Sequence, residues 1–285
     1  MSPRVSLVTG ASSGIGRAVV LRLAERGDRL ALVARGVEVL EETAEEARAR
    51  GAASVHVAPA DVGDDEAIGE RVREVLARHG RIDDVVCSAG VAAYGRAEEV
   101  PPEIFEAVLH TNVIGVVNVV RHVLPSMRAR DEGSIVVVGS VVGHLAVPTM
   151  TPYVISKWAL RSLCRQLQVE NRDVGVGISH VAPGGVDTPI YPHAANVHGH
   201  PGTPPPPVLQ PDTVARVVVR RLERPRRQSQ VPALNHLLRL GFVAAPRVYD
   251  AMVGPLFARL ASDASRTVGA TAGNVLSSLQ KVDHR

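Results

Sequence analysis

The feature that most constrains the fold is a glycine-rich turn close to the start of the chain. A short apolar run, Val5–Thr9, leads into Gly10-Ala-Ser-Ser-Gly14-Ile-Gly16, and an amphipathic pattern follows from 17 to 26. This order predicts a strand, a tight turn and a helix. Glycines let the backbone of such a turn approach a pyrophosphate, and the helix N-terminus favours its negative charge. The spacing Gly-x-x-x-Gly-x-Gly therefore predicts a dinucleotide-binding start to an α/β fold.

The same alternation of elements continues along the chain. Short apolar runs predict further strands, and helical patterns lie between them. The expected strands are 30–34, 54–58, 85–90, 134–140 and 174–181, and the expected helices include 37–50, 64–79, 102–128 and 211–223. Strands that alternate with helices in this way predict an α/β fold with a Rossmann-type, doubly wound parallel sheet flanked by helices. Residues 1–232 are expected to form this dinucleotide-binding and catalytic domain.

Composition narrows the class of protein further. The chain has 285 residues, 45% of them hydrophobic, which is enough for one large domain. The net charge is only +3 and the basic residues are scattered, so no nucleic-acid partner is expected. Cys87 and Cys164 are the only cysteines, and with no signal peptide in view the expected location is cytoplasmic. No Cys-His spacing typical of a metal site is present, so no metal is expected.

Tyr153 and Lys157 predict a site for proton transfer. They are spaced i, i+4, and because Pro152 suits the first turn of a helix, both side chains would lie on one helix face. A nearby ammonium lowers the pKa of a tyrosine, which is about 10 when free. Ser140, at the end of an expected strand, would hydrogen-bond a substrate oxygen. Since only Lys157 and Lys281 are lysines among 32 basic residues, a lysine here indicates chemistry rather than coincidence.

Residues at the ends of the expected strands indicate how a dinucleotide is bound. Arg35 follows the second strand, where an acidic residue often binds the ribose of NAD, and an arginine instead would accept a 2′-phosphate. The alternative is that Arg35 is a solvated loop residue. Asp61, followed by Val62, would accept a hydrogen bond from an adenine amino group. Ala89 and Gly90 are small enough to let a cofactor lie against the edge of the sheet.

Asn112 lies inside an apolar stretch at 108–120. A buried asparagine is costly unless it is hydrogen-bonded. We therefore expect its amide to hold a backbone group or a water molecule.

The C-terminal third of the chain predicts the substrate side of the molecule. Residues 189–210 are rich in proline and glycine and predict a long binding loop. Within 234–262 an apolar stripe at helical spacing predicts helices that pack on the substrate side or on a sister subunit, with contact to a membrane surface as the weaker alternative. We expect 233–285 to form a helical extension and tail on the same domain, and the small, polar tail after 262 to fray. The residues expected to line a largely apolar pocket are Tyr94, Val142, His144, Leu145, Val147, Met150 and Tyr191.

Taken together, these motifs resemble the short-chain dehydrogenase/reductase superfamily, in its short single-domain branch. The resemblance covers roughly 4–190 and depends on the glycine turn, Asp61-Val62, Ala89-Gly90, Asn112, Ser140, Tyr153-x-x-x-Lys157 and Pro183-Gly184. One departure is Cys87-Ser88, where the family commonly has two asparagines that steady the central sheet.

The resemblance implies an oxidoreductase that uses NAD(P), with Tyr153 as general acid/base. Lys157 would lower the pKa of that tyrosine and bind the nicotinamide ribose, Ser140 would hold the substrate oxygen, and Asn112 would support a proton-relay water. Arg35 is similar to the variant that prefers NADP(H). The implied cofactor-binding residues are Gly10, Ser12, Ser13, Gly14, Ile15, Gly16, Arg35, Asp61, Val62, Ala89, Gly90, Tyr153, Lys157, Pro183, Gly184, Val186 and Thr188.

Two classes of function fit these motifs and the family resemblance. The first is an NADP(H)-dependent carbonyl reductase or alcohol dehydrogenase that acts on a small hydrophobic carbonyl or alcohol, expected as a homo-oligomer. The second is a degenerate dinucleotide-binding sensor or scaffold without catalysis. Degeneration would be expected to remove the Ser140, Tyr153 or Lys157 side chain first, and all three are present, so the enzyme is the stronger hypothesis.

Overall fold

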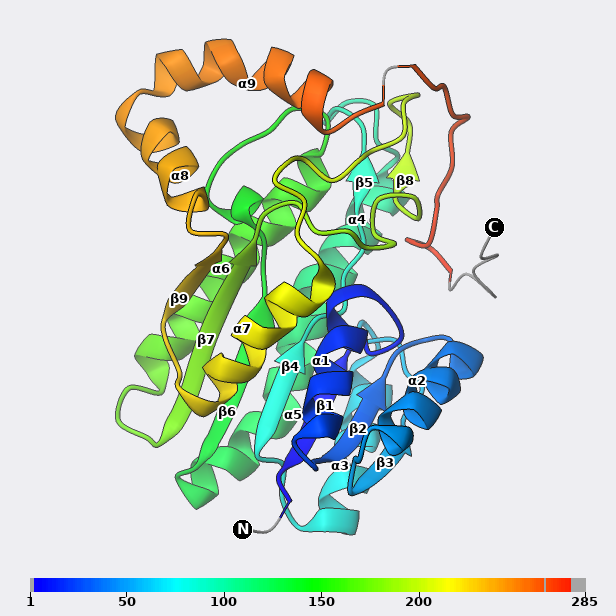
Figure 1. The fold of residues 1–285 in the computed structure, drawn as a ribbon, viewed down its shortest axis with the longest axis vertical. Helices are drawn as coiled ribbons and strands as arrows, with labels where there is room; N and C mark the ends of the chain where they lie inside the picture. Colours follow the sequence, from blue (N-terminus) through cyan, green and yellow to red (C-terminus); the bar gives the residue numbers. More distant parts are fainter. Residues whose placement is uncertain (1–2, 264, 278–285) are drawn as a thin grey trace.

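The core of the molecule is a parallel sheet with helices on both faces (Figure 1). The structure, a computed structural model, describes residues 3–263 and 265–277. Seven strands lie in the order β3-β2-β1-β4-β6-β7-β9, and every pairing between them is parallel. Their bounds are β1 Val5–Thr9, β2 Arg29–Val33, β3 Ser54–Val57, β4 Asp84–Cys87, β6 Gly133–Val138, β7 Val176–Pro183 and β9 Gln228–Val231. This confirms the predicted Rossmann-type sheet.

Helices cover the two faces of the sheet because each presents an apolar side to it. Side chains of α3, α5 and α6 join one buried cluster with the sheet, and those of α1, α2 and α7 join the other. The bounds are α1 Gly14–Glu25, α2 Val37–Ala49, α3 Asp65–His79, α4 Pro102–Leu109, α5 Gly115–Arg130, α6 Thr151–Glu170, α7 Pro211–Glu223, α8 Asn235–Ala244 and α9 Pro246–Leu260. Strands buried on both faces explain the nearly continuous apolar runs in the sequence.

Strand β9 belongs to the seven-stranded sheet but was not among the strands that the sequence predicted. Its residues, Gln228-Ser-Gln-Val231, are mostly polar, and they pair only with β7 at the edge of the sheet. An edge strand has one solvated side, so it does not need the apolar run by which strands are recognised. A second, two-stranded sheet joins β5 Ala93–Tyr94 to β8 Ala195–Asn196, within the expected 189–210 loop.

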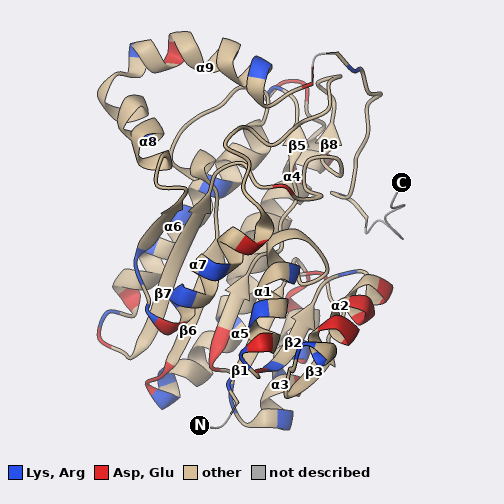
Figure 2. Ribbon diagram, in the orientation of Figure 1, with Lys and Arg blue, Asp and Glu red and all other residues tan. Residues whose placement is uncertain are grey.

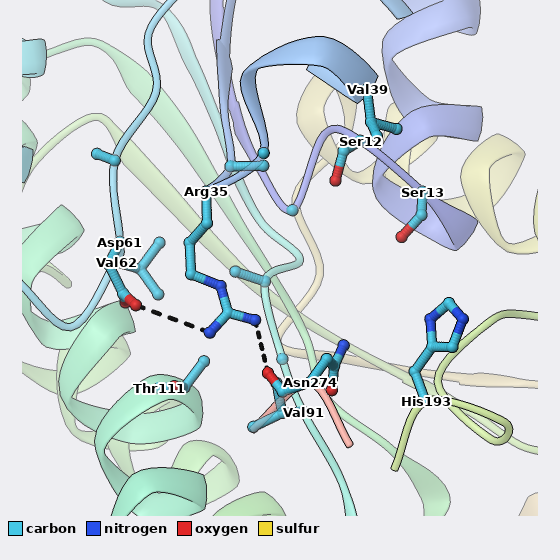
Figure 3. A pocket seen from close by; sticks show the side chains of 16 residues that line it. Ser12, Ser13, Arg35, Val39, Asp61, Val62, Val91, Thr111, His193 and Asn274 are labelled. Carbon is cyan, nitrogen blue, oxygen red and sulfur yellow. Dashed lines mark hydrogen bonds and ion pairs between the residues drawn. The ribbon is translucent and has the colours of Figure 1, made fainter. Parts of the chain in front are cut away.

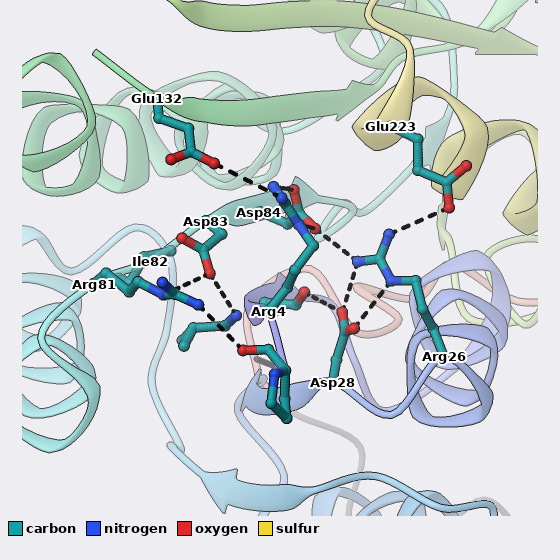
Figure 4. A network of polar contacts seen from close by, with 12 residues as sticks. Arg4, Arg26, Asp28, Arg81, Ile82, Asp83, Asp84, Glu132 and Glu223 are labelled. Atoms are coloured by element: carbon teal, nitrogen blue, oxygen red, sulfur yellow. Dashed lines mark hydrogen bonds and ion pairs between the residues drawn. The ribbon is translucent and has the colours of Figure 1, made fainter. Parts of the chain in front are cut away.

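A network of ion pairs closes the edge of the sheet where the strands begin (Figure 4). The Arg4 guanidinium donates to both carboxylate oxygens of Asp84, at 2.9 and 2.8 Å, and Arg26 donates to Asp28 and Asp84, each at 2.6 Å. The two aspartate side chains are almost fully buried, so each depends on these partners. This edge is therefore occupied by structural contacts, and the opposite edge, where the strands end, is left for a site.

The long helical pattern predicted at 102–128 is divided in the structure. A π-helical turn, His110–Ile114, separates α4 from α5 and carries Asn112. Such turns occur often at functional sites. By length and composition Pro102–Arg130 would be apolar enough to cross a membrane, but valines of α5 pack into the main core, which accounts for that composition.

Helices α8 and α9 form an arm that projects beyond the end of the sheet (Figure 1). They carry few charges (Figure 2). The apolar stripe of α9 divides into two rows: Tyr249 and Phe257 are partly buried toward the body, whereas Met252 and Leu256 are 58% and 47% exposed. The arm therefore packs on the rest of the molecule through one row of side chains and leaves the other row exposed to solvent.

Candidate active site

The glycine turn between β1 and α1 has the geometry of an anion cradle. Gly10 and Gly14 have φ angles of +66° and +51°, which favour glycine, and a methyl group on Gly16 would come within 2.1 Å of the Gly10 carbonyl oxygen. Ser13 is the N-cap of α1, but its side chain makes no capping hydrogen bond, and no acidic residue lies in the first turn. The N–H groups at this helix end therefore suit a phosphate.

A cleft runs along the carboxyl ends of the strands, beside this turn. Two adjoining hollows of about 860 and 820 Å³ share Gly10, Ser13, Ala89 and Gly90 in their walls. The first also contains Ser12, Arg35, Asp61 and Val62, and the second contains Gly14, Ile15, Ser140, Tyr153, Lys157, Pro183, Gly184, Val186 and Thr188. The fold thus brings together every residue expected at the dinucleotide except Gly16, which supports the turn from behind.

Arg35 lies across the first hollow (Figure 3). Its Nη2 donates to the Asn274 backbone oxygen at 2.7 Å, and its Nη1 lies 3.9 Å from Asp61 Oδ2. Asp61 Oδ1 also accepts from the Gly63 N–H at 2.8 Å. Arg35 is therefore not a free loop residue, since it lines the cleft and is held there by two partners.

Thr9 contacts the chain at the departure Cys87-Ser88. Its Oγ1 accepts from the backbone N–H groups of Ser88 and Ala89, at 3.2 and 3.3 Å. These contacts tie β1 to the chain just after β4 without help from asparagine side chains. Cys87 itself is buried, and burial raises the pKa of its thiol to about 12, so it is a packing residue.

Tyr153, Lys157 and Ser140 meet where α6 crosses the end of β6. Pro152 lies in the first turn of α6, as expected, and Lys157 Nζ is 5.4 Å from the centre of the Tyr153 ring. Lys157 is only 4% exposed, and its Nζ donates to the Val138 carbonyl at 3.4 Å. Ser140 caps a short 3₁₀ turn, Val141–Gly143, by accepting from Val142 N. The three side chains therefore form one compact group.

Burial dominates the electrostatics of this group. It raises the pKa of Tyr153, and the neighbouring Tyr191 adds to the effect, while a hydrogen bond with Ser140 lowers that pKa. Burial also lowers the pKa of Lys157 from 10.5 to about 8. Burial therefore has the larger effect on the pKa of Tyr153 in this structure, and the lowering of that pKa by Lys157 stays a prediction.

Asn112 performs the backbone role expected of a buried asparagine. Its Oδ1 accepts from Val91 N at 2.8 Å, and its Nδ2 donates to Val91 O and to Ser156 Oγ, both at 2.9 Å. Ser156 lies in α6 beside Lys157. Asn112 thus joins the chain after β4 to the helix that carries the tyrosine and the lysine.

A third hollow, of about 530 Å³ and largely apolar, adjoins the tyrosine. Of the residues expected in the substrate pocket, it contains Tyr94, Ser140, Val142, Met150 and Tyr191, and it also contains Phe257 of α9. His144, Leu145 and Val147 are absent from its walls.

The placement of His144 in the substrate pocket was wrong. It follows the 3₁₀ turn, which directs its side chain into the interior. There its ring packs edge-on against His180 with 5.7 Å between centroids, and its Nε2 lies 2.7 Å from Gln228 Nε2. Burial lowers the pKa of His144 to about 4, so it is a neutral core residue near the polar strand β9.

The sequence analysis missed several residues of the cleft, and two of them line both hollows. His193 and Asn274 line both dinucleotide hollows. His193 belongs to the proline-rich loop, and Asn274 to the tail that was expected to fray. That expectation is wrong for 271–275, because Thr271 bridges Asn196 and Val275 is only 3% exposed, and the part of it beyond 277 lies outside the described residues. Neither residue had a local sequence signal, since both reach the cleft through long-range contacts.

The sequence of the chain is similar to those of known proteins. A family model described as short chain dehydrogenase matches residues 4–196. The 2-(R)-hydroxypropyl-CoM dehydrogenase of Xanthobacter autotrophicus is 35% identical over 190 residues, which cover 66% of this chain and 76% of that protein.

Solved structures agree with the fold. An alcohol dehydrogenase from Thermococcus sibiricus, complexed with 5-hydroxy-NADP, is 33% identical with a TM-score of 0.71 and covers 80% of this chain and 96% of its own. A protein from Mycobacterium paratuberculosis, bound to NAD, is 25% identical with a TM-score of 0.70 and covers 80% and 95% of the two chains. One of these structures contains 5-hydroxy-NADP and the other contains NAD. The similarity to them therefore does not decide which dinucleotide this chain prefers, and that preference has to be argued from its own residues.

Proposed function

The chain belongs to the short-chain dehydrogenase family, and from that premise we propose that it is an NADP(H)-dependent oxidoreductase with Tyr153 as general acid/base. The substrate is a hydrophobic carbonyl compound or secondary alcohol. The observation that carries the proposal is a shared wall: Ser140 and Tyr153 line both the second dinucleotide hollow and the apolar hollow. A proton donor at that wall would reach a substrate oxygen beside the nicotinamide.

The residues of the cleft fit a nicotinamide dinucleotide. The glycine turn and the uncapped start of α1 suit its phosphates, Asp61 suits an adenine amino group, and the small side chains of Ala89 and Gly90 leave room at the sheet edge. When bound, the dinucleotide supplies or accepts the hydride. The chain's own residues then hold the substrate and handle the proton.

The role of each catalytic side chain follows from its surroundings. The Tyr153 hydroxyl carries a proton at neutral pH, since the pKa of a free tyrosine is about 10 and burial raises it further, so the group is in the form that can donate to a carbonyl oxygen. Ser140, hydrogen-bonded to Tyr153, would hold that oxygen as its charge changes. Lys157, with a pKa lowered to about 8 by burial, would favour the phenolate that remains while it is still charged. A sensor or scaffold would need none of these groups, and so it is not favoured.

Tyr153→Phe tests the assignment. The variant loses the proton donor and keeps the ring, so turnover of a ketone found by screening should fall at least about 100-fold. Dinucleotide affinity, measured separately by fluorescence titration, should change little. Retention of more than a tenth of the wild-type rate would refute Tyr153 as the general acid.

The preference for NADP(H) rests on Arg35. Its guanidinium lines the first hollow, and 34–36, directly after β2, contain no acidic residue that would repel a 2′-phosphate. A charge-assisted hydrogen bond contributes about 1.5–3 kcal/mol, so kcat/KM should favour NADP(H) by at least about tenfold. Arg35→Ala should remove most of that preference and leave activity with NAD(H) little changed, whereas Ala34→Asp should penalise NADP(H) by repulsion. An Arg35→Ala variant with an unaltered cofactor ratio would exclude Arg35 as the phosphate-binding residue.

The apolar hollow supports a hydrophobic substrate. It is lined by Phe257 of the arm and by Tyr191 of the proline-rich loop. A panel of ketones and secondary alcohols, followed by nicotinamide absorbance, identifies the substrate class. A preference for charged substrates would contradict this part of the proposal.

A further inference from the structure

The end of the described chain forms a strap, residues 271–277, beside the dinucleotide cleft. Thr271 forms an antiparallel bridge with Asn196 of β8, with backbone hydrogen bonds of 2.9 and 2.8 Å. Val275 is 3% exposed and joins the apolar cluster formed by β5, α4 and β8. Gly273 has a φ of +53°, and a methyl group on it would come within 2.2 Å of the His193 carbonyl oxygen. The strap is therefore anchored at both ends of a tight turn.

This anchoring places Asn274 in the middle of the cleft. Its N–H donates to the His193 carbonyl at 2.9 Å, and its own carbonyl accepts from Arg35 Nη2 at 2.7 Å. Figure 3 shows it between Arg35 and His193, across the hollow from Ser13. It lines both dinucleotide hollows. Within the described residues, no hydrogen bond engages its side-chain amide.

We propose that Asn274 is a cofactor-binding residue and that the strap completes the dinucleotide site from the side opposite the glycine turn. The inference rests on the dinucleotide of the proposed function. An amide that is held by its backbone, lines both hollows and has no hydrogen-bond partner among the described residues offers two donors and one acceptor to the cofactor. The part of a dinucleotide that joins its two halves carries the phosphates and ribose hydroxyls that such an amide can bind.

The proposal predicts that Asn274 and Arg35 have different effects on the binding of NADP(H) and NAD(H). The 2′-phosphate distinguishes NADP(H) from NAD(H), but the central phosphates and riboses are common to both. Loss of the Asn274 amide should therefore weaken both dinucleotides equally, whereas loss of the Arg35 guanidinium should weaken NADP(H) alone. The strap also lies over the cleft, so a bound dinucleotide should slow exchange of the strap's backbone amides.

Asn274→Ala and the matched control Leu276→Ala test the proposal on the full chain. Leu276 is the exposed neighbour of the anchor and lines neither hollow. By fluorescence titration, we expect Asn274→Ala to raise Kd about tenfold for both NADPH and NADH, about 1.4 kcal/mol, and Leu276→Ala to change it less than about twofold. Unchanged Kd values for Asn274→Ala would overturn the proposal, and tighter binding would overturn it too, by showing that the strap competes with the cofactor.

Hydrogen exchange gives a second readout that does not depend on activity. The amides of Thr271 and Asn274 are hydrogen-bonded to Asn196 and His193, so NADPH should slow exchange of the peptide that contains them in the wild type and much less in Asn274→Ala. A strap whose exchange is unaffected by saturating NADPH would refute the inference while leaving the proposed function intact. A wild-type protein that binds neither dinucleotide would refute both.

Discussion

Replacing Lys157 by methionine should stabilise the fold while removing the activity. The Lys157 ammonium is almost fully buried, and burial lowers its pKa from 10.5 to about 8. That difference means that the folded state holds the charged form at a cost of about 3 kcal/mol near pH 7. Methionine has a similar length and no charge. Loss of the long hydrogen bond from Nζ to Val138 should offset about 1 kcal/mol of the gain, which leaves a net stabilisation of about 2 kcal/mol.

The pH dependence identifies the cause. Since the pKa of this lysine is lower in the folded protein than in the unfolded chain, the penalty is fully present below about pH 8 and disappears as the pH rises past 10.5. The advantage of Lys157→Met should therefore shrink by about 2 kcal/mol between pH 7 and pH 9.5, in urea unfolding followed by circular dichroism. Lys157→Arg, which keeps a charge, is the control and should gain nothing. A Lys157→Met variant that is less stable than wild type at pH 7, or whose advantage is equal at both pH values, would refute the reasoning.

Three further predictions follow from other parts of the molecule. Arg26→Met leaves a buried aspartate short of its ion-pair partner, so it should lower the free energy of unfolding by about 3 kcal/mol in urea titrations without changing dinucleotide affinity. Gly16→Ala puts a methyl group 2.1 Å from the Gly10 carbonyl oxygen, so NADPH affinity should fall at least about tenfold, and undiminished binding in a fluorescence titration would contradict the cradle. Met252→Ser with Leu256→Ser removes exposed apolar side chains of α9, so self-association or vesicle binding in sedimentation assays should decrease, and no change in either would show that this face docks nothing.

Much of the fold could be read from the sequence because its signals are local. The apolar runs of the central strands, the glycine turn and the proline at the start of α6 each depend on a few consecutive residues, and the structure places all of them as predicted. The pairing of Tyr153 with Lys157 is equally local, since it needs only one helical turn. These elements fix where the dinucleotide hollows lie.

Other features were decided only when distant segments met. β9 is polar and becomes a strand because β7 offers it an edge. His144 enters the core because Gln228 and His180 are there to receive it. The pKa of Tyr153 is raised because several elements together exclude water, which no spacing along the chain reveals.

Asn274 shows most plainly the difference between what local sequence signals predict and what long-range contacts decide. In the sequence it stands in a small, polar tail without periodicity, where fraying is the natural expectation. In the folded chain the burial of Val275 and the bridge from Thr271 to Asn196 fix its backbone at the cleft, beside segments that are distant in sequence. The sequence by itself determined the sheet, the turn and the catalytic helix, since those depend on local propensity and periodicity. Only the tertiary structure decided what surrounds them, because burial and long-range contacts exist only after the chain has folded.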